Sequence, residues 1–145
     1  MRFARVILGV AGVYGLIVLL PLYFERAKYE RLAPPVITHL EFYYGFVGVT
    51  VAWQVAFLMI AAQPLRYRPL MIPCCLEKFS YGIAVLVLGF QNQIAAIAMA
   101  FGTVDLVLGV LFVISYVRVG SATGAEVNVT GGRSRAPLPA DPPRH

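Results

Sequence analysis

Four long apolar runs, separated by short polar connections, dominate the pattern of the chain. Charged side chains gather mostly between the runs rather than within them. Each run is close to the roughly 20 residues that a helix needs to cross the hydrocarbon core of a bilayer. The pattern therefore predicts an all-α fold, a four-transmembrane-helix antiparallel bundle in residues 1–118, with these spans: about 4–24, 41–63, 74–92 and 95–117.

The second run is the clearest of these. It carries no charge from Phe42 to Ala62, and Gln54 is its only strongly polar side chain. Thr38 stands three residues before Glu41, the spacing at which the two side chains can cap each other's backbone amides. We therefore expect this helix to start at a capping box.

Small residues recur at helical spacing along the runs, and small side chains allow close helix contact in a membrane. One edge of the second span is predicted to pack on a neighbouring helix: Glu41, Gly45, Gly48 and Ala52. The glycines expected at helix contacts are Gly9, Gly12, Gly45, Gly48, Gly102 and Gly109.

Prolines and charges mark the ends of the spans. Pro69 and Pro73 indicate that the apolar stretch around them lies along the membrane interface, and that the third helix begins near Cys74. Glu77 and Lys78 then fall in its first turn, where the helix dipole favours a carboxylate and a lysine can extend to water. The predicted interfacial charges are Glu41, Glu77, Lys78, Arg66 and Arg68.

Composition points to a membrane, with 59% hydrophobic and only 13% charged residues. The net charge of +5 does not indicate nucleic acid, because the basic residues form short clusters between apolar runs. Nine Lys and Arg lie at the N-terminus, in residues 63–78 and in the tail, against three in the first connection, which predicts cytoplasmic termini. Residues 119–145, rich in Gly, Ser, Ala and Pro, are expected to form a disordered cytoplasmic tail.

Asp105 is the sharpest candidate for chemistry, because a carboxylate in mid-span costs roughly 2.5–3.5 kcal/mol to insert and usually faces protein or water. The helical rise places Thr50 at a similar depth and Gln54 a turn deeper, so the three would meet if the second and fourth spans are neighbours. The candidate ligand or proton site is Asp105, Gln54, Thr50, Tyr43 and Tyr81. A structural role, in which Asp105 only fixes helix packing, is the equal alternative.

Common catalytic and cofactor motifs are absent from the sequence. It has no P-loop, dinucleotide fingerprint, zinc-helix signature, nucleophile elbow or paired catalytic carboxylates. Cys74 and Cys75 are adjacent, so they cannot join distant segments, and His39 and His145 lie outside the spans, which argues against haem. No catalytic residue and no metal site are therefore predicted.

Several segments resemble known membrane proteins. They are EFYYGFVGVTVAWQ at Glu41–Gln54, RYRPLM at Arg66–Met71, LEKFSYG at Leu76–Gly82 and DLVLGVLF at Asp105–Phe112. With four spans in about 120 residues, the chain resembles a group of small uncharacterised bacterial membrane proteins and, more loosely, DoxX-like four-helix proteins. The resemblance implies a compact bundle in the bacterial inner (plasma) membrane. Some DoxX relatives are associated with quinone-linked sulfur oxidation, so the resemblance makes a quinone a possible cofactor. The residues themselves predict no cofactor, and no family catalytic residue matches a position here.

Three classes of function follow. The preferred one is a non-enzymatic bundle that binds a lipophilic ligand or acts as a partner subunit, in a homo-oligomer or with another membrane protein. The second is a small oligomeric proton-coupled carrier in which Asp105 titrates. The third is the membrane subunit of a quinone-linked oxidoreductase, where Asp105, Gln54 and Tyr81 offer hydrogen bonds to the quinone.

Overall fold

The described part of the chain is built from helices. The computed structural model describes residues 1–32 and 36–133, with side chains up to Ser121. Its elements, in order, are α1 (Arg2–Leu19), the 3-10 helix η1 (Leu20–Tyr23), α2 (Arg26–Leu32), α3 (Leu40–Ala62), η2 (Arg68–Leu70), α4 (Met71–Phe90) and α5 (Ala96–Arg133). These residues contain no strand, which confirms the predicted all-α fold.

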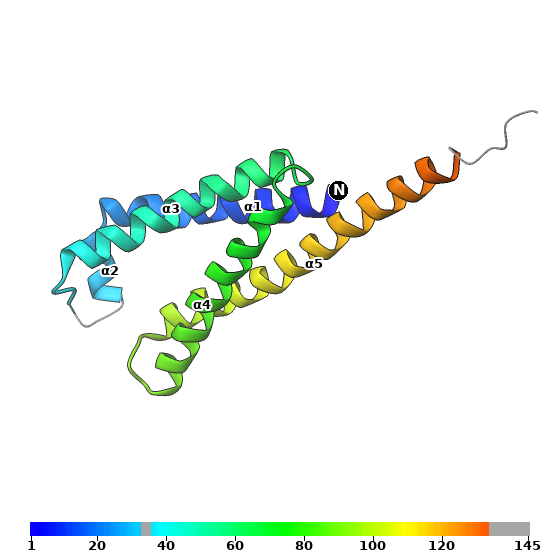
Figure 1. Cartoon of the computed structure of the whole chain (residues 1–145). Helices are drawn as coiled ribbons and strands as arrows, with labels where there is room; N and C mark the ends of the chain where they lie inside the picture. Colours follow the sequence, from blue (N-terminus) through cyan, green and yellow to red (C-terminus); the bar gives the residue numbers. More distant parts are fainter. Residues whose placement is uncertain (33–35, 134–145) are drawn as a thin grey trace, which may run out of the picture.

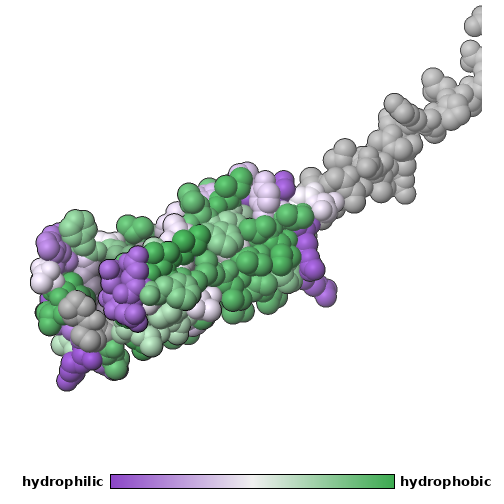
Figure 2. All heavy atoms as spheres, turned by 90° about the horizontal axis from the view of Figure 1, so that it is seen from below, coloured by the Kyte–Doolittle hydropathy of each residue, from purple (hydrophilic) through white to green (hydrophobic). Residues whose placement is uncertain are grey.

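Four helical segments are long and apolar enough to cross a membrane. They are Arg2–Tyr23, Leu40–Ala62, Arg68–Phe90 and Ala96–Ser121. Figure 2 shows apolar side chains over the middle of the molecule and hydrophilic ones near its two ends. Large apolar side chains such as Ile17, Phe42 and Leu76 are exposed on the outer surface. Lipid can surround such a surface without the free-energy cost that water would impose.

The helices form two antiparallel hairpins. α1 lies along α3, and α4 lies along α5, while α1 also contacts α5. The hairpins meet at the end that holds the N-terminus and diverge toward α2 and the turn between α4 and α5 (Figure 1). At the end where they meet, the Phe57 and Phe112 rings pack with centroids 4.9 Å apart. The core at this end consists of Ala4, Leu8, Ala11, Phe57, Ile60, Met71, Cys74, Phe112 and Val119.

Glycines set the close contacts within both hairpins. A methyl group added to Gly12 of α1 would lie 2.9 Å from the backbone oxygen of Gln54 on α3. A methyl group added to Gly82 of α4 would lie 3.0 Å from the backbone oxygen of Gly102 on α5. These positions therefore need glycine for the helices to keep their present separation. The other predicted contact glycines, with neighbouring side chains 3.1 to 3.8 Å from an added methyl group, are Gly9, Gly48 and Gly109.

One edge of α3 faces outward instead of packing on a helix. A methyl group added to Gly45 would meet no atom within 4 Å in the described structure, and Glu41 and Ala52 are exposed. The prediction that this edge packs closely is therefore wrong for most of its length. The opposite side of α3 is buried and includes Val47 and Gln54. Its larger side chains make more dispersion contacts than glycine and alanine can offer.

Two helix starts differ from the sequence expectation. α3 begins after His39 without a side-chain cap, so the capping box of Thr38 and Glu41 does not form. The Thr38 hydroxyl oxygen lies 2.9 Å from Nδ1 of His39 instead. α4 begins at Met71 and includes Pro73 in its first turn, where a proline displaces no helical hydrogen bond. The stretch expected along the interface is thus part of the helix.

α5 continues beyond the last predicted span. That span was expected to end at residue 117, whereas the helix runs to Arg133. Of the tail that the sequence analysis expects to be disordered, residues 134–145 lie outside the described part of the chain.

Candidate functional site

A cavity of about 590 Å³ lies between the two hairpins. Side chains from α1, α2, α3, α4 and α5 line it, so every long helix contributes a wall. Most of the lining is apolar, and its aromatic members are Tyr14, Tyr29, Phe46, Trp53, Tyr81 and Phe101. Ligand pockets usually measure roughly 300–1,000 Å³, so the space suits a small molecule.

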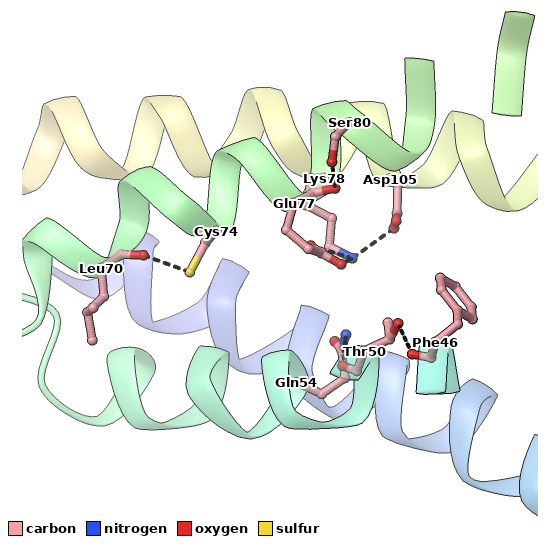
Figure 3. Close-up of polar contacts among 9 residues, drawn as sticks. All are labelled: Phe46, Thr50, Gln54, Leu70, Cys74, Glu77, Lys78, Ser80 and Asp105. Atoms are coloured by element: carbon pink, nitrogen blue, oxygen red, sulfur yellow. Dashed lines mark hydrogen bonds and ion pairs between the residues drawn. The ribbon is translucent and has the colours of Figure 1, made fainter. Parts of the chain in front are cut away.

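A cluster of charged side chains forms one wall of this cavity. The Lys78 ammonium donates a hydrogen bond to Oδ1 of Asp105 at 3.0 Å and lies 3.3 Å from Oε2 of Glu77 (Figure 3). Lys78 comes from α4 and Asp105 from α5. Each stands about one turn from the Gly82–Gly102 contact, which brings the two backbones close enough for the side chains to meet.

The three members of this ion cluster differ in their burial. The Lys78 side chain is only 5% exposed, whereas those of Glu77 and Asp105 are 15% and 16% exposed. The Phe57 ring also covers the ammonium, with its centre 5.3 Å from Nζ. The carboxylates therefore face the cavity more openly than the ammonium does.

Glu77 keeps unused hydrogen-bonding capacity. Its Oε1 accepts a long hydrogen bond from Lys78 at 3.5 Å. Its Oε2 is buried and, among the described residues, accepts no hydrogen bond. A carboxylate oxygen away from water is stabilised when it accepts a hydrogen bond or pairs with a charge, so this atom depends on the Lys78 ammonium, 3.3 Å away.

Thr50 and Gln54 lie across the cavity from the ion cluster, on α3 (Figure 3). The Thr50 hydroxyl donates to the backbone oxygen of Phe46 at 2.7 Å, and the Gln54 amide nitrogen donates to the backbone oxygen of Thr50 at 3.1 Å. Gln54 packs its amide against Gly15 of α1. Both side chains thus satisfy part of their hydrogen bonding on their own helix, and α3 lies mainly against α1 rather than α5.

The structure separates the two tyrosines of the predicted site. Tyr81 lines the cavity, and its ring stacks on that of Phe46 with centroids 5.7 Å apart. Tyr43 is not among the cavity residues, and its hydroxyl donates to the backbone oxygen of Leu22 at 2.9 Å. Tyr43 therefore joins α3 to the end of the first span instead of meeting Asp105.

The remaining predicted interfacial charges lie at helix ends. Glu41 is exposed in the first turn of α3, and Arg66 is exposed beyond its last turn. The Arg68 guanidinium donates to the backbone oxygen of Tyr116 at 3.2 Å and lies 4.1 Å from the centre of that ring. Arg68 thus lies near the end of a span and also connects η2 to α5.

Glu77 and Lys78 do not lie in the first turn of their helix, where the sequence predicts them as interfacial charges. α4 begins at Met71 and places them about two turns into the helix, beside Asp105. A sequence signal for this ion cluster does exist. The third apolar span holds a basic and an acidic residue, and the fourth holds a single acidic one. Charged side chains inside a membrane usually pair with one another.

Comparisons with protein-family models, curated proteins and solved structures found no match to this chain. The DoxX-like resemblance of the sequence therefore stays a prediction. What the site can do follows from its own geometry, an apolar cavity with an ion cluster in one wall.

Proposed function

We propose that this chain is a multi-pass protein of the bacterial inner membrane that binds a lipophilic molecule in the cavity between its hairpins. It acts without catalysis, as a binding protein or as the ligand-holding subunit of a membrane complex. The observation that carries this proposal is the cavity, about 590 Å³ in volume with walls from all four long helices.

The chemistry of the walls supports a lipophilic ligand. Aliphatic and aromatic side chains supply most of the surface, and the deep polar groups are few: Tyr14, Thr50, Gln54, Glu77, Lys78, Tyr81 and Asp105. Small-molecule pockets usually combine a mostly apolar lining with a few polar groups. Burial of the ligand's apolar part supplies affinity, and the polar groups fix its orientation.

The distribution of basic residues supports cytoplasmic termini. The N-terminus and residues 63–70, with Arg66 and Arg68, lie at the end where the hairpins meet, and the positive-inside rule assigns these basic segments to the cytoplasm. α2 then lies on the outer side. Glu25 and Lys28 line the cavity and are exposed, so the ligand enters from that side.

Native mass spectrometry of the protein, purified into phosphatidylcholine nanodiscs, tests ligand binding. We expect a small lipophilic molecule to remain bound to the wild type. Thr50→Phe fills the cavity and should remove the bound mass, while Thr103→Phe, the same change at an exposed position outside the cavity, should retain it. A bound quinone would assign the ligand to the quinone class, and a stoichiometric second protein would identify a partner subunit.

An empty cavity in the wild type would contradict the proposal if lipophiles added back also fail to bind. Equal retention by Thr50→Phe and wild type would contradict the site, because the bound molecule would then lie elsewhere on the protein.

A proton-coupled carrier is the second candidate, because the ion cluster holds two carboxylates around one ammonium. One carboxylate can take up a proton while the other stays paired with Lys78. In proteoliposomes that contain a pH-sensitive dye, a transported compound should change the internal pH, and Glu77→Gln should abolish the change. Binding without any proton movement would contradict the carrier and leave the binding function intact.

A further inference from the structure

We infer that the lipophilic ligand is a cation whose positive charge binds beside the carboxylates of Glu77 and Asp105. The inference rests on the proposed function, since it assigns a charge to the ligand of the same cavity. The cavity supports it through its formal charge, the burial of Lys78, the exposed parts of the Glu77 and Asp105 carboxylates and the aromatic walls.

The cavity is acidic although the whole chain is basic. Its charged lining residues are Glu25, Lys28, Glu77, Lys78 and Asp105. Three carboxylates and two ammonium groups leave one net negative charge, against +5 for the chain. Near α2, the exposed Lys28 and Glu25 neutralise each other at 2.8 Å. The unbalanced negative charge therefore belongs to the ion cluster deeper in the cavity, where apolar surroundings screen it weakly.

The only ammonium group in the ion cluster is not available to an anion. Lys78 is 5% exposed, is covered by the Phe57 ring and lies 3.0 Å from Asp105. An anionic headgroup would have to displace one of its carboxylates and leave that carboxylate buried and unpaired, which is costly. A cation instead approaches the carboxylates from the cavity, on the side away from Lys78.

The exposed parts of the two carboxylates mark where the positive group would bind. The Glu77 and Asp105 side chains line the cavity and are 15% and 16% exposed, while Oε2 of Glu77 is buried and pairs with Lys78 at 3.3 Å. A second positive group would complete an alternating arrangement of two carboxylates and two cations. Opposite charges stabilise each other most where water is excluded.

The aromatic walls suit a cation that carries apolar substituents. Six aromatic side chains line the cavity, and Phe46 and Tyr81 stack there with centroids 5.7 Å apart. The faces of Trp, Tyr and Phe rings attract cations through their negative quadrupoles. The same rings bury hydrocarbon, so a hydrophobic amine or phosphonium is favoured over a small hydrated ion.

Three probes of similar shape and different charge test the inference in phosphatidylcholine nanodiscs: tetraphenylphosphonium, tetraphenylborate and the neutral triphenylmethanol. Trp53 is the only tryptophan of the chain and lines the cavity, so its fluorescence reports occupancy. We expect a saturable change with tetraphenylphosphonium at a concentration at least about tenfold lower than with the other two. The Thr50→Phe protein supplies the baseline for partition of each probe into lipid.

Glu77→Gln should weaken tetraphenylphosphonium binding at least about tenfold, and by a larger factor than it weakens triphenylmethanol binding. Glu41→Gln, the same change at an exposed site outside the cavity, should leave both unchanged. The comparison of the three probes needs only the wild type and the Thr50→Phe baseline, so it remains decisive if Glu77→Gln does not fold. Tighter binding of the anion or of the neutral probe would overturn the cationic ligand while supporting a lipophile site. No saturable response to any probe would overturn the proposed function as well.

Discussion

The ammonium of Lys78 depends on its neighbours because it has almost no access to water. It is 5% exposed and lies between the carboxylates of Asp105 and Glu77. Removing one partner of a buried ion pair leaves the other charge without compensation, which destabilises far more than the loss of an exposed pair. At the scale of single residues, the ion cluster therefore has a structural role as well as the proposed binding role.

Lys78→Met should lower the free energy of unfolding by about 3–5 kcal/mol, because two carboxylates would then face each other without a counter-ion. Equilibrium unfolding in mixed detergent measures the change. Adding Asp105→Asn to this variant should recover part of the loss, since it removes one uncompensated charge. Lys28→Met is the matched control, and because its side chain is 62% exposed its effect should stay below about 1 kcal/mol. Equal effects of the two lysine substitutions would contradict a buried role for Lys78.

Close contact between helix backbones decides which elements pair. In the first hairpin α1 approaches α3 at Gly12, and in the second α4 approaches α5 at Gly82 and Gly102. α3 also carries Gly45 on its exposed edge, where no helix of the described structure covers it. Glycines at similar spacing therefore differ in effect according to what stands opposite them.

Gly12→Ala should destabilise the protein by about 1–3 kcal/mol, because the new methyl group would overpack against Leu58 and the backbone of Gln54. Gly45→Ala should change stability by less than about 1 kcal/mol, since the added methyl group meets open space and alanine favours the helix. Thermal unfolding of both variants in the same detergent provides the comparison. A larger loss from Gly45→Ala would mean that this edge contacts a partner.

The turn between α4 and α5 depends on one residue in the left-handed backbone region. Asn92 has φ of 56°, and asparagine tolerates this conformation better than most side chains. Asn92→Gly should therefore preserve stability, whereas Asn92→Val should cost about 1–2 kcal/mol. Gln91→Val, at φ of −83°, is the neighbouring control. Equal losses of stability in Asn92→Val and Gln91→Val would show that the backbone conformation of residue 92 does not determine the stability of the turn.

The whole molecule has a packed end and an open end. The core joins the hairpins near the N-terminus, and the cavity lies where they diverge toward α2. If the packed end faces the cytoplasm, only the open end is exposed to the outer side. The orientation of the protein in the membrane therefore also decides from which side a ligand can enter the cavity.

Labelling of single cysteines in intact cells tests the orientation. In a background with Cys74→Ala and Cys75→Ala, Lys28→Cys near α2 should react with a membrane-impermeant maleimide added outside. Arg66→Cys, beyond the end of α3, should react only after the cells are opened. Both positions are exposed in the structure, so a difference reflects the membrane rather than burial. The reverse pattern would place the termini outside.

The sequence by itself determined the helical class and the four apolar segments, because these follow from local patterns of apolar and polar residues. It also identified Asp105, Thr50, Gln54 and Tyr81, which line the same cavity. These residues stand out because polar side chains are rare in apolar spans.

Only the tertiary structure decided which helices pair and which charges meet. Helical periodicity says which residues share a face, but not which helix lies opposite that face. The start of α4 at Met71 and its close contact with α5 brought Lys78 to Asp105. The hydroxyl of Tyr43 was directed to Leu22 by the packing of α3 on α1. The cavity and its net negative charge result from that packing, since they depend on side chains from five helices that are distant in sequence.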